Sequence, residues 1–356
     1  MSIQITPEIV ASMAAGSAVF GGGGGGDPAL GELMAAHAVS RYGPVDLIDL
    51  DDLDDDSLIV PIAFIGAPTV IQEKIPNGIE GKLILEAMEE LLDRPVGAFM
   101  SAELGGLNGV IPVAWCARHG IPLADADLMG RAFPELQMVT PTIFDREISP
   151  VVLVDERGNV GVFRTETNEW AEKLVRSVTV AMGGSASLGL YPMTAEVARD
   201  VSVRGSISRS IEVGRALLDS PDDPLDALAS STGAIKLIEG KLIDVERRTE
   251  AGWASGTAIV EGTGPDTGSV LRVEFQNENL VAIRDGEPAA TVPDIITLVD
   301  IHTGRPVVTE ILRYGQRVAA VALPCDPVWR TERGLELVGP RRFGYDIDYT
   351  PVGEPL

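Results

Sequence analysis

The stretch Ser57-Leu58-Ile59-Val60-Pro61-Ile62-Ala63-Phe64-Ile65-Gly66 decides the fold class, because apolar residues fill it from Leu58 to Ile65 without alternation. A strand with this pattern is buried on both faces, which is typical of parallel sheets with helices on each side. Helical patterns flank it, at residues 29–42 before it and 79–92 after it. The stretch therefore predicts an α/β domain with an open sheet.

The alternation of strands and helices continues on both sides of this stretch. Strands are predicted at 45–50, 96–100 and 121–124, and helices at 7–17, 110–119, 168–181 and 206–218. From about Gly233 the chain changes to short alternating runs separated by turn signals such as Gly264-Pro265-Asp266. We predict an α/β domain over 1–175 and a second domain over 176–356 that is β-rich from about 233, with a ligand cleft between them.

Composition limits the partners of the protein. The chain has 356 residues and is 45% hydrophobic, and its 28 Lys and Arg against 53 Asp and Glu give a net charge of −25. Such a charge argues against binding to nucleic acid or to an anionic membrane. The acidic run at 49–56 is typical of a solvated loop. We therefore expect a small-molecule substrate as the partner, and a homo-oligomer on general grounds.

The two cysteines, Cys116 and Cys325, lack the spacing of a metal site, which fits a reducing cytoplasm. The N-terminus has no signal-peptide pattern, and no apolar stretch reaches the length of a membrane span. We therefore predict a cytoplasmic protein that does not cross a membrane.

The run Gly21-Gly22-Gly23-Gly24-Gly25-Gly26 is followed by Asp27-Pro28 and a helical pattern. Six glycines lose much conformational entropy on folding, which is useful only where the backbone needs positive φ or approaches a ligand closely. Asp27 is a good N-cap, so the run leads to a helix N-terminus, where N–H groups bind anions. The run is neither a P-loop nor a dinucleotide fingerprint. We predict that it contacts the substrate; a ligand-free flexible linker is the alternative.

Polar clusters follow two of the predicted buried strands, at the ends where α/β proteins bind ligands. After 57–66 comes Glu73-Lys74, which either points at the site or is an ordinary surface pair. After 96–100 comes Glu103-Leu104-Gly105-Gly106-Leu107-Asn108, in which the glycines allow a ligand close to the backbone. Asn108 is either a site amide or a helix N-cap. Glu103 leaves an apolar strand and needs a partner if it is buried.

A third cluster combines carboxylates with an arginine between residues 125 and 135. Asp125 and Asp127 point to opposite faces if the strand continues, and converge if the chain turns. Arg131 offers a planar fork, and Glu135 lies in the first turn of a helix predicted to begin at Pro134. Such a set could bind a divalent metal, divide into an acid and a base, or form a structural ion-pair network. The cofactor, including a divalent metal, is left open.

His302 is the histidine to which we assign a role. It alternates with Asp300 in the β-rich part, so the two side chains share a face of the predicted strand. They could form a base with its orienting carboxylate, or two metal ligands, and a structural histidine is the alternative. Cys325 is a weak candidate nucleophile, and Cys116 is predicted to lie in the core.

Eight segments together resemble one family of proteins. They lie at 21–28, 66–68, 73–74, 103–108, 293–294, 312–315 and 339–346, with the most specific being Asp125-Ala126-Asp127-Leu128-Met129-Gly130-Arg131-Ala132-Phe133-Pro134-Glu135. This set resembles the S-methyl thiohydantoin desulfurase family, which is loosely grouped with hydantoinases and oxoprolinases. The resemblance extends over nearly the whole chain.

The resemblance implies an α/β domain followed by a β-rich domain, and a small cyclic, imide-like substrate. The implied reaction replaces a methylthio group on the ring by water and yields a hydantoin and methanethiol. We predict that Glu103, Asp125, Asp127 and His302 are catalytic, and that the substrate is bound by Gly24, Gly25, Gly26, Asp27, Glu73, Lys74, Asn108, Arg131 and Glu135. Two other functions stay open: an ATP-using enzyme of the hydantoinase or oxoprolinase type, and a non-catalytic small-molecule binding protein.

Overall fold

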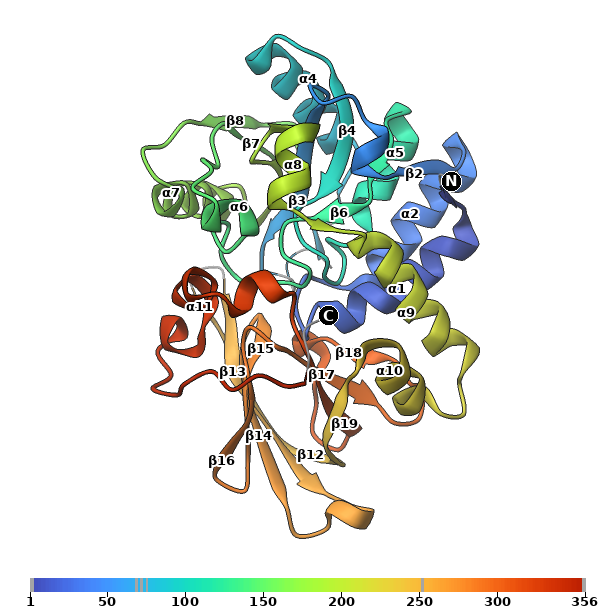
Figure 1. Ribbon diagram of the computed structural model, residues 1–356, viewed down its shortest axis with the longest axis vertical. Coiled ribbons are helices and arrows are strands. Elements are labelled where there is room, and N and C mark those ends of the chain that lie inside the picture. The colour runs from blue at the N-terminus through green and yellow to red at the C-terminus, as the bar shows by residue number, and fades with distance from the viewer. Residues whose placement is uncertain (1–2, 68–69, 71–72, 75, 251–252, 354–356) are drawn as a thin grey trace.

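The computed structural model describes the chain except residues 1–2, 68–69, 71–72, 75, 251–252 and 354–356. The predicted fold class is confirmed, because a mixed α/β part is followed by a β-rich part. In Figure 1 the α/β part forms the upper half of the molecule and the β-rich part the lower half. The predicted division at residue 175 stays a prediction.

The upper sheet is built around β3 (Leu58–Gly66), every residue of which is buried except Gly66. It is parallel to β4 (Val96–Ser101) on one side and antiparallel to β9 (Ser185–Gly189) on the other. Over the described residues the strand order is β1-β2-β5-β4-β3-β9-β7-β8, with β10 added to β3. The remaining strands are β1 (Ile3–Ile5), β2 (Val45–Ile48), β5 (Leu123–Ala124), β7 (Val151–Val154), β8 (Val160–Phe163) and β10 (Met193–Thr194). The short pair β6 (Ala126–Asp127) and β11 (Val203–Arg204) lies apart from it.

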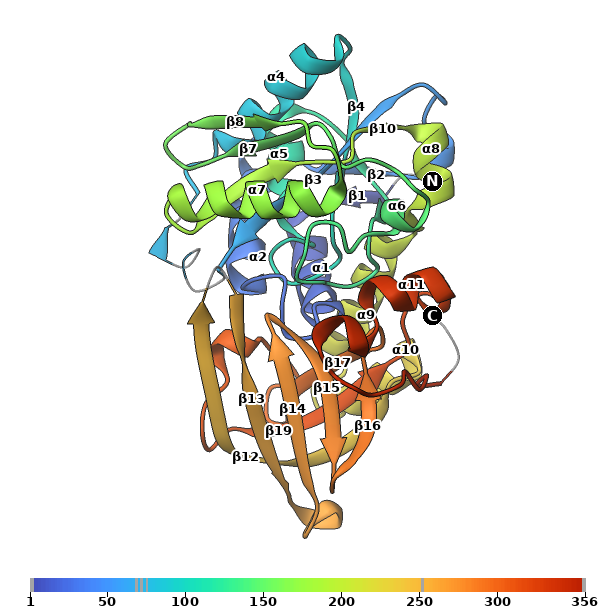
Figure 2. The same ribbon diagram turned by 90° about the vertical axis from the view of Figure 1, so that its left-hand side faces the viewer.

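Successive residues of β3 enter two different cores, which explains its unbroken apolar pattern. Leu58, Val60, Ile62 and Phe64 pack in one core, and Ile59, Ala63 and Ile65 in the other. The first core is covered by α1 (Pro7–Phe20), α2 (Pro28–Tyr42), α4 (Glu80–Leu92) and α5 (Ile111–His119). The second is covered by α7 (Asn168–Ala181) and α8 (Ala195–Val201), and Figure 2 shows α7 lying across this face of the sheet.

The predicted helix ends follow from local chemistry. The Asp27 side chain accepts a hydrogen bond from the Ala29 N–H at 2.9 Å, so Asp27 caps α2 as predicted. At the end of α5, Gly120 takes φ = 67°, which favours glycine. One predicted helix is wrong: residues 134–137 form bends and turns, and the next helix is the short α6 (Thr140–Ile143).

The β-rich part is one antiparallel sheet in the order β16-β15-β14-β13-β12-β19-β17-β18 over the described residues. The third hydrophobic core of the molecule lies against this sheet. The strands are β12 (Ile235–Glu250), β13 (Trp253–Gly262), β14 (Val270–Gln276), β15 (Glu278–Arg284), β16 (Glu287–Thr291), β17 (Ile295–Asp300), β18 (Pro306–Val307) and β19 (Arg317–Leu323), and the flanking helices are α10 (Pro224–Thr232) and α11 (Glu332–Val338).

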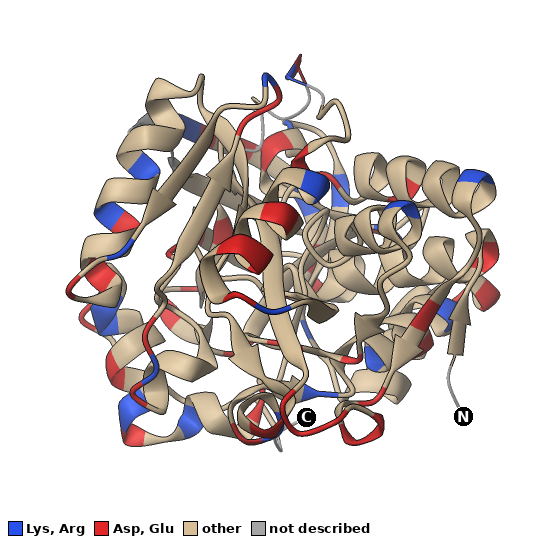
Figure 3. Ribbon diagram, turned by 90° about the horizontal axis from the view of Figure 1, so that it is seen from above, with Lys and Arg blue, Asp and Glu red and all other residues tan. Residues whose placement is uncertain are grey.

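Charged residues are interspersed along the outer helices and loops when the molecule is seen from above (Figure 3). In the part of the chain that the structure describes, no helix has both the length and the apolar character to cross a membrane.

Helix α1 packs closely against α9 (Ser206–Asp219) because glycines lie at their crossing. A Cβ on Gly214 would overlap the carbonyl oxygen of Ser12, and one on Gly16 would overlap the carbonyl oxygen of Ser210. The atoms nearest to each added Cβ are backbone atoms of the other helix, which cannot rotate away as the end of a flexible side chain could. The glycines therefore set the distance between these two helices.

We expect Gly214→Ala to lower the free energy of unfolding by about 2–3 kcal/mol, because the helices must separate to admit the methyl group. The intrinsic helix preference of Ala acts in the opposite direction by about 1 kcal/mol. Urea unfolding measures the difference, with Arg215→Ala, an exposed neighbour on α9, as the control. Equal stability of Gly214→Ala and the wild type would contradict this account of the packing.

Candidate active site between the two parts

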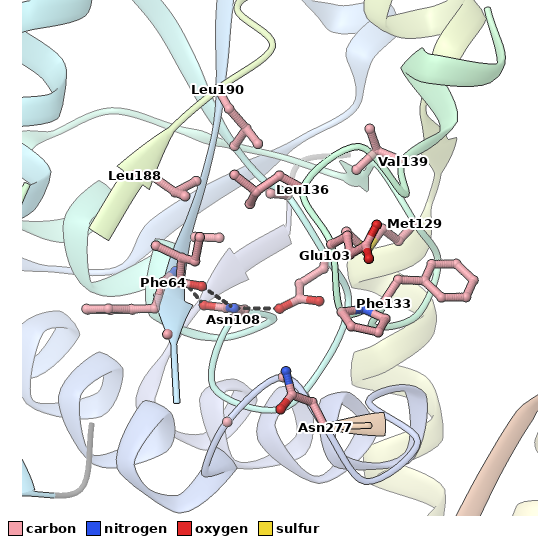
Figure 4. A pocket seen from close by; sticks show the side chains of 18 of the residues that line it. Phe64, Glu103, Asn108, Met129, Phe133, Leu136, Val139, Leu188, Leu190 and Asn277 are labelled. Atoms are coloured by element: carbon pink, nitrogen blue, oxygen red, sulfur yellow. Dashed lines mark hydrogen bonds between the residues drawn. The ribbon is translucent and has the colours of Figure 1, made fainter. Parts of the chain in front are cut away.

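A cavity of about 70 Å³ lies where the carboxyl end of β3 meets the β14–β15 connection. It has room for several water molecules, since one needs roughly 10–15 Å³ of such space. Its walls are mainly apolar and come from Phe64, Ile65, Met129, Phe133, Leu136, Val139, Leu188 and Leu190. Its polar groups include Glu103, Asn108, Asn277 and Glu278. Figure 4 shows Glu103 and Asn108 above Asn277. The cavity is thus built by segments far apart in the sequence.

Glu103 is fixed in this cavity by Asn108. The Asn108 Nδ2 group donates to Oε1 of Glu103 at 2.5 Å and to the Phe64 carbonyl at 3.0 Å, and Asn108 Oδ1 accepts from the Phe64 N–H at 2.7 Å. The β3–β4 pairing ends at Ile62 and Ser101, so the amide occupies the position where the next strand residue would pair. The N-cap alternative for Asn108 is wrong, because Val110 precedes α5 and no side chain caps it.

Burial raises the pKa of Glu103 to about 7, and the negative charge of Asp127 acts in the same direction. The Asn108 amide, the Phe133 N–H and the charge of Arg131 oppose this rise. Only 8% of Glu103 is exposed. Near neutral pH this carboxyl is therefore available in both its protonated and its ionised form, as a residue that moves protons requires.

Glu278 is a second buried carboxyl of the cavity, and the sequence did not identify it. Burial raises its pKa well above the ordinary value, and the negative charge of Glu103 adds to the rise while Arg131 opposes it. Its Oε2 atom has no hydrogen-bond partner among the described residues. A Cβ on Gly24 would overlap its Oε1, so that glycine makes room for the carboxyl. In the sequence, Gln276-Asn277-Glu278-Asn279 resembles any polar turn.

The glycine run is a packed loop, so the flexible-linker alternative is wrong. Its carbonyl groups accept hydrogen bonds from both parts of the molecule: Gly22 from Asn279 N and Gly23 from Thr309 N at 2.8 Å, Gly25 from Asn108 N at 3.1 Å and Gly26 from Leu107 N at 3.2 Å. Gly25 and Gly26 take φ of 78° and 82° and line the cavity. Among the described residues, no backbone carbonyl accepts from the N–H groups of Gly25 and Gly26. Asp27 does not line the cavity.

Asp125 and Asp127 do not converge. Asp125 accepts from the N–H and the hydroxyl of Ser208, at 2.9 and 2.5 Å, at the start of α9. Oδ2 of the fully buried Asp127 accepts from the N–H groups of Leu104, Met129 and Gly130 at 2.8 to 2.9 Å. Burial raises the pKa of Asp127 to about 7, against these hydrogen bonds. Asp125 thus binds the start of α9 and Asp127 the backbone of neighbouring loops, and neither lines the cavity.

Arg131 lies beside the cavity and joins the two parts of the molecule. Its NH1 donates to the carbonyls of Pro293 and Asp294 at 2.6 and 2.9 Å, and its guanidinium lies 4.4 Å from the centre of the Phe133 ring. Its positive charge lowers the pKa of Glu103 and of Glu278, against the effect of burial. It therefore acts on the site through its charge, without lining the cavity.

Glu135 lines the cavity, and its Oε2 accepts from Arg342 at 2.8 Å. Arg342 belongs to the short 3₁₀ helix η5 (Pro340–Phe343) near the C-terminus. Arg176 of α7 also lines the cavity and donates to the Pro134 carbonyl at 3.1 Å. Glu135 and Arg176 thus add two further charged side chains to the lining of the cavity.

The remaining predicted residues lie elsewhere. Glu73 is exposed, and Lys74 pairs with Glu156 at 2.6 Å and donates to the carbonyls of Met182 and Ser185. His302 is exposed on a turn in which Asp300 accepts from the N–H groups of His302 and Thr303. Asp300 thus closes its own turn and does not orient the imidazole. Residues 68–69 and 71–72, before Glu73, lie outside the described residues.

Both cysteines, Cys116 and Cys325, are free and buried. Burial raises the pKa of Cys325 to about 12, and burial also raises the pKa of Cys116, so neither thiol is a reactive thiolate near neutral pH. Within the described ranges, no group of three or more His, Cys, Asp or Glu side chains could hold a metal ion.

Comparisons with known proteins bear on the whole chain. A family model described as "S-Me-THD-like, N-terminal domain" matches residues 8–165, and one described as "S-Me-THD-like, C-terminal domain" matches residues 166–352. An X-ray crystal structure of a protein from Chromobacterium violaceum has a TM-score of 0.83 at 23% sequence identity, covering 99% of this chain and 100% of the other. That likeness shows the fold. No curated protein matches the chain.

Proposed function

The chain belongs to the S-Me-THD-like family over both of its domains, and from this premise we propose that it replaces the methylthio group of an S-methyl thiohydantoin, or a closely related ring, by water. The observation that carries the proposal is Glu103, a buried carboxyl with a pKa of about 7 in the wall of a mainly apolar cavity. Apolar walls with a few placed polar groups suit a small, uncharged ring.

Glu103 acts first as the general base. In its ionised form it takes a proton from a water molecule, and the water oxygen bonds to the ring carbon that carries sulfur. The electron pair of the ring C=N bond moves to nitrogen and is shared with the neighbouring ring carbonyl. The N–H groups of Gly25 and Gly26 are donors that could stabilise this charge.

Glu278 acts as the general acid. Its raised pKa favours the protonated form, and in that form it gives its proton to sulfur as the carbon–sulfur bond breaks. The new hydroxyl group becomes the second ring carbonyl, and its proton restores Glu278. The proton on Glu103 passes to the ring nitrogen. The products are a hydantoin and methanethiol, and both carboxyls return to their starting forms.

Methanethiol release from S-methyl thiohydantoin by the purified protein tests this proposal. We expect release in proportion to enzyme, unchanged by prior treatment with a chelator. Release that disappears with the chelator and returns with a divalent ion would replace the acid–base mechanism by a metal-assisted one. Absence of release from this substrate would overturn the proposed reaction and shift attention to another cyclic amide, with and without ATP.

We also propose that the protein works in the cytoplasm as a homo-oligomer. The support for the location is that both cysteines are free and buried. Sedimentation measures the oligomeric state directly. A monomer at micromolar concentration would contradict the second part of this proposal.

A further inference from the structure

We propose that Asn277 is a further catalytic residue, whose side-chain amide donates to the ring carbonyl and stabilises the negative charge that develops there. The inference rests on the proposed function, because it concerns the same cavity and the same ring. Neither the sequence motifs nor the family resemblance includes this residue.

The backbone of Asn277 is held in an unusual conformation at the cavity. Asn277 connects β14 to β15 and takes φ = 57°, a left-handed value that non-glycine residues seldom adopt. Its N–H donates to the Ala254 carbonyl at 2.6 Å, and the Thr309 hydroxyl donates to its carbonyl at 2.7 Å. Rare backbone conformations that are fixed from several sides gather at functional sites.

The orientation of the amide group follows from its one clear hydrogen bond. Asn277 Oδ1 accepts from the Ala254 N–H at 2.9 Å, and since that group can only donate, the oxygen must face Ala254. The Nδ2 group therefore faces the other way, and Figure 4 shows it turned up toward the space beside Glu103. Asn277 lines the cavity and is 8% exposed. Its Nδ2 donates to no residue that the structure describes.

Such a donor matches what the proposed reaction requires. When water adds to the sulfur-bearing carbon, the ring nitrogen and carbonyl gain negative charge. The two nearby carboxyls cannot stabilise that charge as ionised groups, because they carry the same sign. A neutral amide held in place before the reaction can do so, as oxyanion donors do in other enzymes. Asn277 therefore adds a donor from the lower part of the molecule to the lining that Gly25 and Gly26 contribute from the upper part.

A purely structural role for Asn277 makes a different prediction. The left-handed conformation is available to Asp and Gly as well as Asn. An Asp would also keep the bond from the Ala254 N–H. If the residue only shapes the turn, both substitutions should be harmless to turnover.

We would compare Asn277→Asp and Asn277→Gly with the wild type, and use Gln276→Ala, a neighbour that does not line the cavity, as the control. Removal of the donor should lower kcat about 100-fold in both variants, with a smaller change in KM. Asn277→Asp adds a negative charge that raises the pKa of Glu103 further, so the kcat of each protein is taken at the maximum of its own pH profile. Thermal unfolding confirms that each variant is folded.

The outcomes separate the two proposals. Variants whose kcat at the maximum of the pH profile is within threefold of the wild type would overturn the role of Asn277 and leave the desulfurase function standing. A wild type without turnover would overturn the reaction, and calorimetry with hydantoin then decides the inference. Weaker hydantoin binding by Asn277→Gly than by the wild type would support the donor role, whereas equal binding, or none by either, would overturn it.

Discussion

Glu103→Gln should lower kcat for methanethiol release by about 1,000-fold, because the amide cannot take a proton from water. Gln has nearly the same shape, and its oxygen can still accept the hydrogen bond from Asn108 Nδ2. The cavity should therefore keep its geometry and its affinity for hydantoin. The loss should appear in kcat, which is the sign of an interaction that acts in the transition state.

In the wild type, kcat/KM should rise with pH through about 7, as Glu103 ionises. Glu73→Gln is the matched control, since Glu73 is an exposed Glu outside the cavity. Turnover of Glu103→Gln within tenfold of the wild type would show that another group is the base.

The same substitution should make the protein more stable at neutral and alkaline pH. The pKa of Glu103 rises from 4.5 to about 7 on folding, so between these values the unfolded chain loses its proton while the native protein keeps it. The native state binds more protons there, and its stability falls as pH increases. Above pH 7 the full difference of about 3 kcal/mol has been lost. Below pH 4.5 both states are protonated and the effect vanishes.

Urea unfolding of wild type and Glu103→Gln at pH 4.5 and 8 measures this effect. The stability of the variant minus that of the wild type should increase by up to about 3 kcal/mol between the two pH values. The comparison cancels the titrations that both proteins share. A difference that does not change with pH would mean that Glu103 is not a buried, neutral carboxyl in the native protein.

The upper part of the site was predictable from sequence because its signals are local. The apolar run of β3 predicted the buried strand. Glu103 was identified because a carboxyl shortly after a buried strand needs a partner if it is buried itself. Asn108 was identified with it, although its pairing with Phe64 depends on where the β3–β4 ladder ends. Periodicity indicates that a strand ends, but it does not indicate which atoms it leaves unpaired.

The lower part of the site was not predictable in the same way. Asn277 and Glu278 lie in a polar turn more than a hundred residues from Glu103, and only the docking of the two parts places them in the cavity. His302 shows the reverse error, because a histidine and an aspartate on alternating positions gave a plausible pair, yet Asp300 closes its own turn. The local sequence cannot show which of the two turns lies at the site, since both carry side chains capable of acid–base chemistry or hydrogen bonding.

The Pro293-Asp294 segment of the resemblance has a structural explanation. The side chain of Asp294 is completely buried and accepts four hydrogen bonds. The donors are Cys325 N at 2.8 Å and Arg330 NH2 at 3.1 Å to Oδ1, and Tyr349 OH at 3.0 Å and Val352 N at 2.7 Å to Oδ2. Its backbone carbonyl accepts from Arg131. One residue thus ties the C-terminal segment to the β-rich part and to the arginine beside the cavity.

Asp294→Ala should lower the free energy of unfolding by about 3–5 kcal/mol, since it leaves Arg330 and three other donors without their acceptor. Asp294→Asn should lower the free energy of unfolding less, by about 1–3 kcal/mol. Its amide oxygen can still accept from Cys325 N and Arg330, but its NH2 group then faces the Val352 N–H, and both of these groups are donors. Urea unfolding gives both values. Asp348→Ala, which breaks the exposed pair with Arg341, should change stability by less than about 1 kcal/mol.

Partial proteolysis distinguishes a C-terminal segment that has come loose from a general loss of stability. If Asp294 anchors the C-terminal segment, Asp294→Asn should be cut after Arg341 or Arg342 under conditions in which the rest of the chain stays intact. Tyr349→Phe, which removes one of the four hydrogen bonds, should show the same cleavage more slowly. The anchor would be disproved by a C-terminal segment that resists trypsin as well in Asp294→Asn as in Asp348→Ala. In that case the packing of Val352 in the third core, and not the hydrogen bonds of Asp294, would hold the C-terminal segment in place.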